Sequence, residues 1–338
     1  MRVELHRHQS RLLADNPLGD PAQRDVILLL PPSYEAATAR RYPVVLVLPG
    51  YGGTGWQLAY HRSAWTAPFE RRIGDAMRSG KVREAILVLP DCFTRYGGSQ
   101  YVDSPAIGRY QSYLADELFA FVDATARTIP RREARAVVGK SSGGYGALVL
   151  AMQRPDVACA IAAHAADGAF ELSYLRDLPK TVLALEKRGG IPAFLQWFDA
   201  QPMKGQHAFD VMSHLCCAAA WSPTARGPFG YGSGFDFPLH LLTAAVRDEV
   251  WSRWLAWDPV RMVDTAALRA GLGGLSALFL DAGLADEHNL QLATRQLAAR
   301  LAQHGVACTH EEFEGGHYNT QYRYERSLAV VTAALATD

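Results

Sequence analysis

A serine between two glycines forms the most distinctive catalytic motif in the sequence. The run Gly139-Lys140-Ser141-Ser142-Gly143 fits the pattern G-x-S-x-G, with a strand-like apolar run before it and a helix-like stretch after it. In this context the glycines leave room for a tight turn that presents the serine hydroxyl above the edge of a sheet. The frame selects Ser141 as the nucleophile, because Lys140 and Gly144 would occupy the glycine positions around Ser142.

A serine nucleophile needs a histidine base and a carboxylate that orients the base. Both residue types follow the motif, the carboxylate first and the histidine second. Asp281 and Asp286 come after the apolar run 275–280, and His317 lies further on in a Gly-Gly loop. This is the chain order Ser…Asp…His of α/β-hydrolases. We favour Asp286 as the acid because the intervening turn extends its reach, and Asp281 is the alternative. Two further histidines are less suited as the base, because His310 lies inside a predicted strand and His288 is at the start of a predicted helix.

Acyl transfer to serine also requires two convergent backbone N–H groups that bind the developing oxyanion. The residue directly after the nucleophile, Ser142, supplies one of them in this type of turn. Residues 44–48 form an apolar run that ends in the glycine-rich segment Pro49-Gly50-Tyr51-Gly52-Gly53. The N–H of Tyr51 is therefore the predicted second donor.

Short apolar runs alternate with helical patterns over residues 25–166, which is typical of a parallel sheet covered by helices on both faces. The predicted strands are residues 26–30, 44–48, 85–89, 136–138, 159–163, 275–280 and 307–313. The predicted helices include residues 110–129, 289–304 and 322–335. This order of elements predicts an α/β-hydrolase fold with a mostly parallel central sheet.

About a hundred residues separate the predicted strands 159–163 and 275–280, far more than an α/β connection needs. We therefore expect a core of residues 1–166 and 264–338, with residues 167–263 inserted as a mostly helical cap. Five of the seven tryptophans of the chain lie in the inserted segment. Trp254, at helical spacing from Trp251 and Trp257, is a candidate for the wall of a substrate pocket. Core packing between helices and a homodimer surface are the alternatives for this stripe.

The composition excludes several classes of partner. With 34 basic and 34 acidic residues the net charge is zero, which gives no electrostatic basis for binding nucleic acid or an anionic membrane. No apolar run approaches the length of about 20 residues that spans a bilayer. The first residues lack the pattern of a secretion signal, so a cytoplasmic location is expected. The five cysteines and eleven histidines form no metal motif, and no cofactor or metal is expected.

Several segments together resemble the putative-esterase branch of the α/β-hydrolases, which includes S-formylglutathione hydrolases (esterase D), feruloyl and siderophore esterases, and mycolyltransferases. The similar segments are YPVVLVLPGYGG at 42–53, SQYVDSPAIGRYQSYLADEL at 99–118, GKSSGGYGAL at 139–148, LDAGLADEHNL at 280–290 and EGGHYNTQY at 314–322. The resemblance covers residues 10–166 and 270–338. It implies that Tyr101 borders the acyl pocket. Pro49 departs from the family pattern, in which many members have histidine.

The residues and the resemblance together predict a serine carboxylic-ester hydrolase that forms an acyl-enzyme on a small-molecule ester or thioester. Transfer of the acyl group to an alcohol by the same residues is an alternative. A serine peptidase is less favoured, because residues 1–24 leave no room for the large domain those enzymes carry. A binding protein on a hydrolase scaffold is the alternative from a different class, and the presence of candidates for all three catalytic residues argues against it.

Overall fold

A mostly parallel sheet forms the centre of the computed structural model, which describes residues 1–60, 64–224 and 234–337. Within these residues the main sheet has eight strands in the order β1-β2-β4-β3-β7-β8-β9-β10. The strands are β1 (Arg2–Gln9), β2 (Gln23–Leu30), β3 (Val44–Leu48), β4 (Ile86–Pro90), β7 (Arg135–Lys140), β8 (Ala160–His164), β9 (Ala277–Gly283) and β10 (Thr309–Phe313). From β4 to β10 every neighbouring pair is parallel, whereas β2 is antiparallel to both β1 and β4. The predicted sheet is confirmed.

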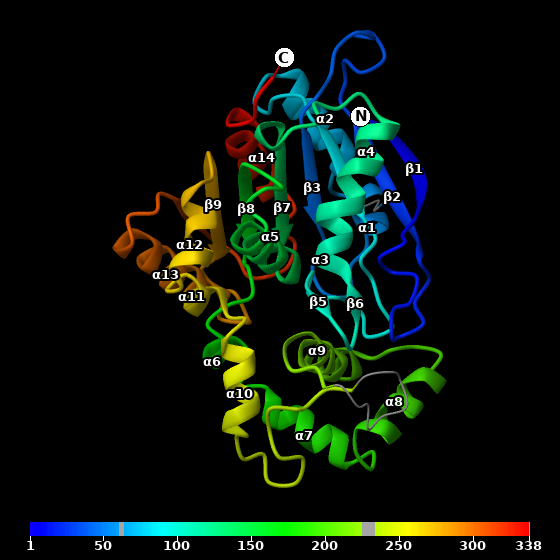
Figure 1. Ribbon diagram of the computed structural model, residues 1–338, viewed down its shortest axis with the longest axis vertical. Coiled ribbons are helices and arrows are strands. Elements are labelled where there is room, and N and C mark those ends of the chain that lie inside the picture. Colours follow the sequence, from blue (N-terminus) through cyan, green and yellow to red (C-terminus); the bar gives the residue numbers. More distant parts are fainter. Residues whose placement is uncertain (61–63, 225–233, 338) are drawn as a thin grey trace.

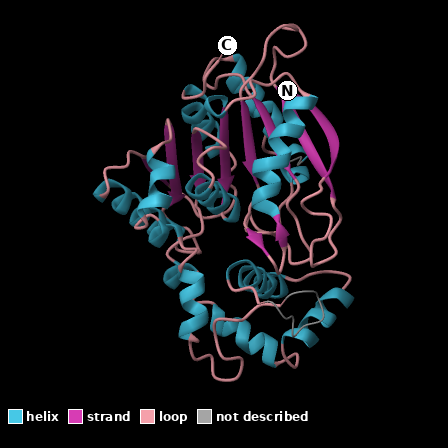
Figure 2. Ribbon diagram, in the orientation of Figure 1, coloured by secondary structure: helices cyan, strands magenta, loops and turns pink. Residues whose placement is uncertain are grey.

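Helices cover both faces of the sheet (Figure 2). The hydrophobic core accordingly lies in two layers, one on each face. In β3, Val44, Leu46 and Leu48 pack into the layer that contains α5 (Ser142–Gln153). Val45 and Val47 pack into the other layer, which contains residues of α2 (Phe69–Arg78) and α14 (Arg323–Ala333). Because successive side chains point to opposite faces and both faces are covered, the strand reads as one continuous apolar run.

Helices of the segment after β8 gather beyond the carboxyl ends of the parallel strands, where Figure 1 shows α7, α8, α9 and α10. The helices of this segment are α6 (Phe170–Ser173), α7 (Leu178–Glu186), α8 (Ile191–Ala200), α9 (Gln206–Trp221), α10 (Asp248–Leu255) and α11 (Pro259–Met262). Around the sheet lie α1 (Gly55–Tyr60), α3 (Tyr110–Ser112), α4 (Phe119–Thr125), α12 (Ala266–Gly273) and α13 (Leu290–Gln303), and a small hairpin of β5 (Asp103–Ser104) and β6 (Gly108–Arg109). None of the helices in the described ranges is both long and apolar enough to cross a membrane.

Two parts of the structure differ from the sequence prediction. The first strand, β1, was not predicted, because only Val3 and Leu5 alternate with its polar and charged residues. The helix predicted over residues 110–129 consists of α3, a π-helical turn over Tyr113–Leu118, and α4, and it ends at Thr125. Ile129 instead lies in an extended segment, where its N–H donates to Tyr42 O. Its side chain is buried there, so its position in the sequence fits the helical spacing although the residue is not helical.

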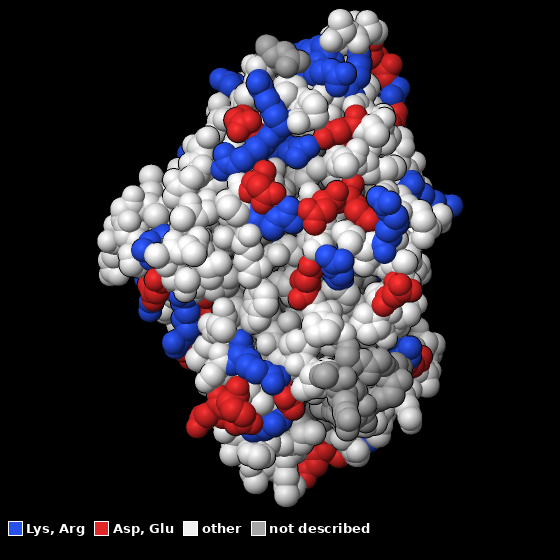
Figure 3. All heavy atoms as spheres, in the orientation of Figure 1, with Lys and Arg blue, Asp and Glu red and all other residues white. Residues whose placement is uncertain are grey.

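Charges of both signs are interspersed on the face of the molecule shown in Figure 3, without a single large basic or acidic area. This distribution agrees with the balanced composition of the chain. On this face, therefore, neither sign of charge dominates.

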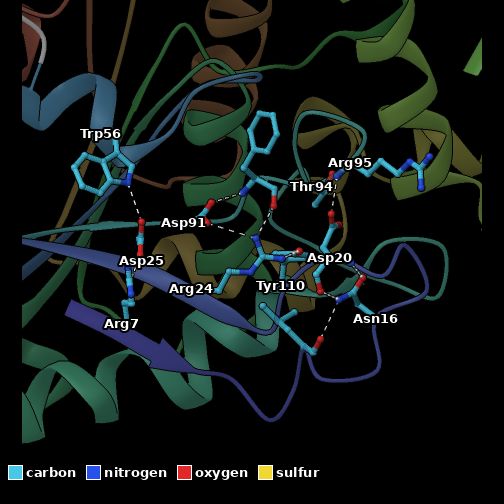
Figure 4. A network of polar contacts seen from close by, with 12 residues as sticks. Arg7, Asn16, Asp20, Arg24, Asp25, Trp56, Asp91, Thr94, Arg95 and Tyr110 are labelled. Carbon is cyan, nitrogen blue, oxygen red and sulfur yellow. Dashed lines mark hydrogen bonds and ion pairs between the residues drawn. The ribbon is translucent and has the colours of Figure 1, made fainter. Parts of the chain in front are cut away.

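A buried arginine ties the antiparallel side of the sheet to the loop that follows β4 (Figure 4). Arg24, on β2, donates a hydrogen bond of 2.8 Å to the carbonyl of Phe93 and one of 2.5 Å to the hydroxyl of Tyr110. Its guanidinium also lies 3.5 Å from the carboxylate of Asp91. Because the arginine is only 3% exposed, these partners compensate for the removal of its charge from water.

We expect Arg24→Met to lower the free energy of unfolding by about 3 kcal/mol, because Tyr110, Asp91 and the carbonyl of Phe93 lose the charged donor of a buried side chain. The matched control is Arg7→Met, since the Arg7 side chain is 65% exposed and lies 3.5 Å from Asp25. Loss of such an exposed pair should cost within about 0.5 kcal/mol. Urea denaturation of both variants measures the difference, and equal midpoints would show that the buried network adds no stability.

Candidate active site

Ser141 lies at the sharp turn between β7 and α5, at the carboxyl edge of the sheet. Its backbone angles are φ 57° and ψ −126°, a conformation that residues with a side chain rarely adopt. Two hydrogen bonds fix this turn: the Ser141 N–H donates to His164 O at 2.8 Å, and the Tyr145 N–H donates to Ser141 O at 2.9 Å. Strained backbone of this kind persists only where the surrounding structure enforces it.

Both glycines of the motif are required by close backbone contacts. A Cβ atom on Gly139 would lie 2.1 Å from the carbonyl oxygen of Gly143, and one on Gly143 would lie 2.0 Å from the carbonyl oxygen of Leu48. Any side chain at these positions would therefore push the start of α5 away from β3 and β7. This packing explains why the motif needs glycine on each side of the serine.

His317 lies in the loop after β10, where its side chain is held by a carboxylate. Its Nδ1 is 2.8 Å from Oδ2 of Asp286, and both residues are buried. Since an ionised carboxylate only accepts hydrogen bonds, Nδ1 carries the proton and the other ring nitrogen is left as an acceptor. Burial opposes ionisation of Asp286, but the bond from His317 and the N–H groups of His288 and Leu290 keep its pKa below the ordinary value.

Asp281, the alternative acid, is engaged elsewhere. Its Oδ1 lies 2.6 Å from Nδ1 of His164, and its Oδ2 accepts a hydrogen bond of 2.7 Å from Nε of Arg323. The other ring nitrogen of His164 lies 2.8 Å from the hydroxyl of Ser327. This second Ser-His-Asp chain is fully buried between β8, β9 and α14, and its residues are not part of the wall of either described cavity.

The predicted oxyanion donors are the N–H groups of Tyr51 and Ser142, and both residues line the same cavity as Ser141. The loop after β3 approaches closely, since a Cβ on Gly50 would be 3.3 Å from Cβ of Ser141. The loop is held by the Tyr51 hydroxyl, which donates to Tyr96 O at 2.7 Å, and by the Gly52 N–H, which donates to Gly97 O at 2.9 Å. Within the described chain, the N–H groups of Tyr51 and Ser142 donate no hydrogen bond.

One cavity of about 440 Å³ brings these residues together. Ser141, His317, Tyr51 and Ser142 all contribute to its wall, which continues along α7 and α9. The Ser141 hydroxyl makes no hydrogen bond to any described residue, His317 included. Aromatic faces and polar groups share the rest of the wall, where the aromatic contributors are Tyr51, Tyr174, Phe209 and Tyr318.

Two residues predicted to line a substrate pocket lie outside this cavity. Trp254 is fully buried, donates its indole N–H to Ser222 at 3.0 Å, and packs against Trp221. Its stripe is therefore core packing between helices, which the sequence pattern alone could not separate from a pocket wall. Tyr101 is 6% exposed, and its hydroxyl donates to Pro49 O at 2.6 Å, so it supports the loop of Tyr51 from behind.

Further polar residues of the cavity were not singled out as site residues from the sequence. Lys140 lines the cavity beside Ser141; burial lowers its pKa, although Asp286 and Glu287 oppose this effect. The ring of His288 lies 4.8 Å from that of His317. Asp167, at the exit of β8, is also in the wall. A polar residue next to a catalytic candidate or directly after a central strand is the signal that could have identified them.

The described part of the chain holds no group of three histidine, cysteine, aspartate or glutamate side chains placed to bind a metal ion. The five cysteines are free, and four of them are buried. The residues that meet in the cavity are instead suited to nucleophilic and acid–base chemistry.

Comparisons with known proteins agree with this arrangement. A family model described as "Putative esterase" matches residues 21–331. Among solved structures, a ferulic acid esterase has 20% identity and a TM-score of 0.64, with 99% of this chain and 98% of that chain covered. The S-formylglutathione hydrolase FrmB of Staphylococcus aureus has 13% identity and a TM-score of 0.55, with 97% and 96% covered. A ferulic acid esterase of Anaeromyces mucronatus has 12% identity and a TM-score of 0.54, with 98% and 91% covered.

These structural likenesses establish the α/β-hydrolase fold, as predicted. Among curated proteins, no sequence matches the chain significantly. At identities of 12–20% the fold is shared. A shared fold alone does not show that this chain acts on the substrates of those proteins.

We expect Gly143→Ala to lower the free energy of unfolding by about 3 kcal/mol or more, because its Cβ would meet the backbone of Leu48 rather than a movable side chain. Gly273→Ala is the matched control. Gly273 ends α12, and the nearest atom to its Cβ position is 3.8 Å away, so alanine should stabilise the helix by up to about 1 kcal/mol. Thermal unfolding of both variants tests the prediction, and a stable Gly143→Ala protein would refute it.

Proposed function

Because the chain belongs to the putative esterase family, we propose that it hydrolyses carboxylic esters through Ser141, His317 and Asp286. Family membership makes it an esterase-type hydrolase and supports carboxylic ester hydrolysis. The roles of the individual residues rest on the geometry of the site. The observation that carries them is the hydrogen bond of 2.8 Å between Asp286 and His317, because His317 lines the same cavity as the strained Ser141.

In the proposed first step, Ser141 Oγ attacks the acyl carbon while Nε2 of His317 takes the hydroxyl proton. Attack requires the two side chains to come within hydrogen-bond reach in the substrate complex. Asp286 holds the ring in the tautomer that leaves Nε2 free and stabilises the imidazolium that forms. The negative charge on the former carbonyl oxygen is bound by the N–H groups of Tyr51 and Ser142, which have no other described partner.

In the proposed second step, the tetrahedral intermediate collapses and His317 returns the proton to the leaving alcohol or thiol. The acyl group is then bound to Ser141 as an ester. Water attacks this acyl-enzyme with His317 again acting as the base, and the carboxylic acid is released. No metal or cofactor takes part in this scheme, because preorganised donors stabilise the developing charge.

We further propose that the substrate is a small-molecule ester or thioester bound between the core and a cap of residues 167–263. The cavity wall supports this division, because it combines loops at the ends of core strands with residues of α7 and α9. Its volume of about 440 Å³ is within the range for small-molecule sites. Product analysis in the presence of an alcohol would distinguish hydrolysis from acyl transfer.

We expect Ser141→Ala to lower kcat/KM for p-nitrophenyl butanoate by at least about 10³-fold, because alanine lacks the hydroxyl that forms the acyl-enzyme in the proposed mechanism. Release of p-nitrophenol measures the rate, and a fluorophosphonate reagent should add mass to the natural protein but not to the variant. The control is Ser252→Ala, an exposed serine on α10 outside the cavity. Activity retained by a folded Ser141→Ala protein would end the proposal.

We expect Asp286→Asn to impair catalysis and Asp281→Asn to impair stability. Asp286→Asn should lower kcat by about 10²- to 10⁴-fold with little loss of stability, because the amide no longer selects the productive tautomer of His317. Asp281→Asn should lower the free energy of unfolding by about 3 kcal/mol, since buried His164 and Arg323 lose their charged partner. Steady-state kinetics and urea denaturation of both variants separate the two effects. A larger kcat loss in Asp281→Asn would reassign the acid.

A further inference from the structure

A buried carboxyl group that the proposed mechanism does not use lies in the wall of the catalytic cavity. Asp167 lies in the loop that leaves β8 (Ala160–His164), and only 5% of its surface is exposed. The two alanines that flank its loop, Ala165 and Ala169, have φ angles of 41° and 45°. Residues with a Cβ atom rarely adopt this region, so the backbone is strained on both sides of the aspartate.

All the hydrogen bonds that Asp167 accepts reach the same carboxylate oxygen. Oδ2 accepts from the hydroxyl of Tyr174 at 2.8 Å, from the hydroxyl of Ser142 at 3.1 Å and from the amide of Gln100 at 3.5 Å. Three donors on one oxygen favour the ionised form of the acid. Burial raises the pKa of Asp167 above its ordinary value, and the bond from Tyr174, the nearby charge of His317 and the bond from Ser142 only partly oppose that rise.

The second oxygen of Asp167, Oδ1, accepts no hydrogen bond from the described residues, although the side chain is part of the cavity wall. No lysine, arginine or histidine in the described ranges forms an ion pair with Asp167 either. A nearly buried carboxylate is normally satisfied on both oxygens or paired with a cation. Oδ1 is therefore available to a group that enters the cavity.

The geometry points to a substrate that carries a hydrogen-bond donor, either a hydroxyl or a protonated amine, close to the scissile carbonyl, with Asp167 as the residue that recognises it. The donor would lie close to the scissile carbonyl because Asp167 accepts a hydrogen bond from the hydroxyl of Ser142, the residue next to the nucleophile. This inference rests on the proposed function, because it names the class of ester that the same site selects.

A purely structural role would not make this distinction between substrates. Asp167 joins the exit of β8 to Tyr174 after α6 and to Gln100 in the loop after β4, so its loss would also disturb the shape of the site. Such a disturbance would slow all esters alike. Recognition through Oδ1 instead changes the ratio of rates between an ester with the donor and an otherwise identical ester without it.

The test compares kcat/KM for chromogenic phenyl esters of four acids: butanoate, β-hydroxybutanoate, β-methoxybutanoate and β-aminobutanoate. The methoxy ester keeps the oxygen but lacks the donor hydrogen, so it tests the inference in the natural protein without any substitution. A second pair, the butanoate esters of propanol and of ethylene glycol, places the donor on the alcohol side. We expect the hydroxy or amino ester, or the glycol ester, to be preferred about tenfold or more over its matched partner.

In Asp167→Ala this preference should fall to near one, while hydrolysis of the plain ester continues. In Asp167→Asn, which keeps an acceptor without the charge, a preference for the amine should fall and a preference for the hydroxyl should persist. Asp210→Asn is the matched control, because Asp210 lines the same cavity from α9 and is paired with Gln206 of its own helix. Its preference ratio should stay as in the natural protein.

The outcomes separate this inference from the proposed function. If the natural protein hydrolyses the plain ester through Ser141 but shows no donor preference in any pair, the inference is wrong and the function stands. An equal preference in the natural protein and in a folded Asp167→Ala variant also refutes it. If no ester is hydrolysed in a Ser141-dependent manner, the proposed function itself fails.

Discussion

The close approach of the first turn of α5 to the end of β3 is the constraint on which the rest of the site depends. A Cβ on Gly143 would lie 2.0 Å from the carbonyl oxygen of Leu48, so the two elements meet without any side chain between them. Beside this contact the loop of Tyr51 closely approaches Ser141, and the serine backbone has a positive φ. The free N–H groups, the strained serine and the glycine requirement are thus consequences of one packing distance.

Two histidine–aspartate pairs show how the same chemistry takes different roles through its surroundings. In both pairs the imidazole Nδ1 lies within 2.6–2.8 Å of a buried carboxylate. The other ring nitrogen of His164, Nε2, contacts the hydroxyl of Ser327 inside the protein, whereas His317 forms part of the cavity wall. The first pair fixes the ends of β8 and β9 and the helix behind them, and the second is available to a substrate.

The sequence predicted those features that local chemistry dictates. The parallel strands are buried on both faces and so appear as apolar runs, and the glycines around Ser141 reflect contacts that exclude side chains. The edge strand β1 escaped prediction because its residues are largely polar, and Trp254 was ambiguous because helical spacing describes core and pocket walls equally. Asp167 was missed because its significance depends on which oxygen its neighbours occupy. That property depends on contacts between residues far apart in the sequence.

The aromatic cluster around Trp221 has a consequence for how the molecule unfolds. Trp221, at the end of α9, lies 5.4 Å from the ring of Tyr145 on α5 and 4.4 Å from the ring of Phe170 on α6, and it also packs against Trp254. The helices between β8 and β9 and the sheet therefore share one continuous hydrophobic interior. Detaching the insertion would expose that interior to water, so the two parts should melt in a single cooperative transition rather than in sequence.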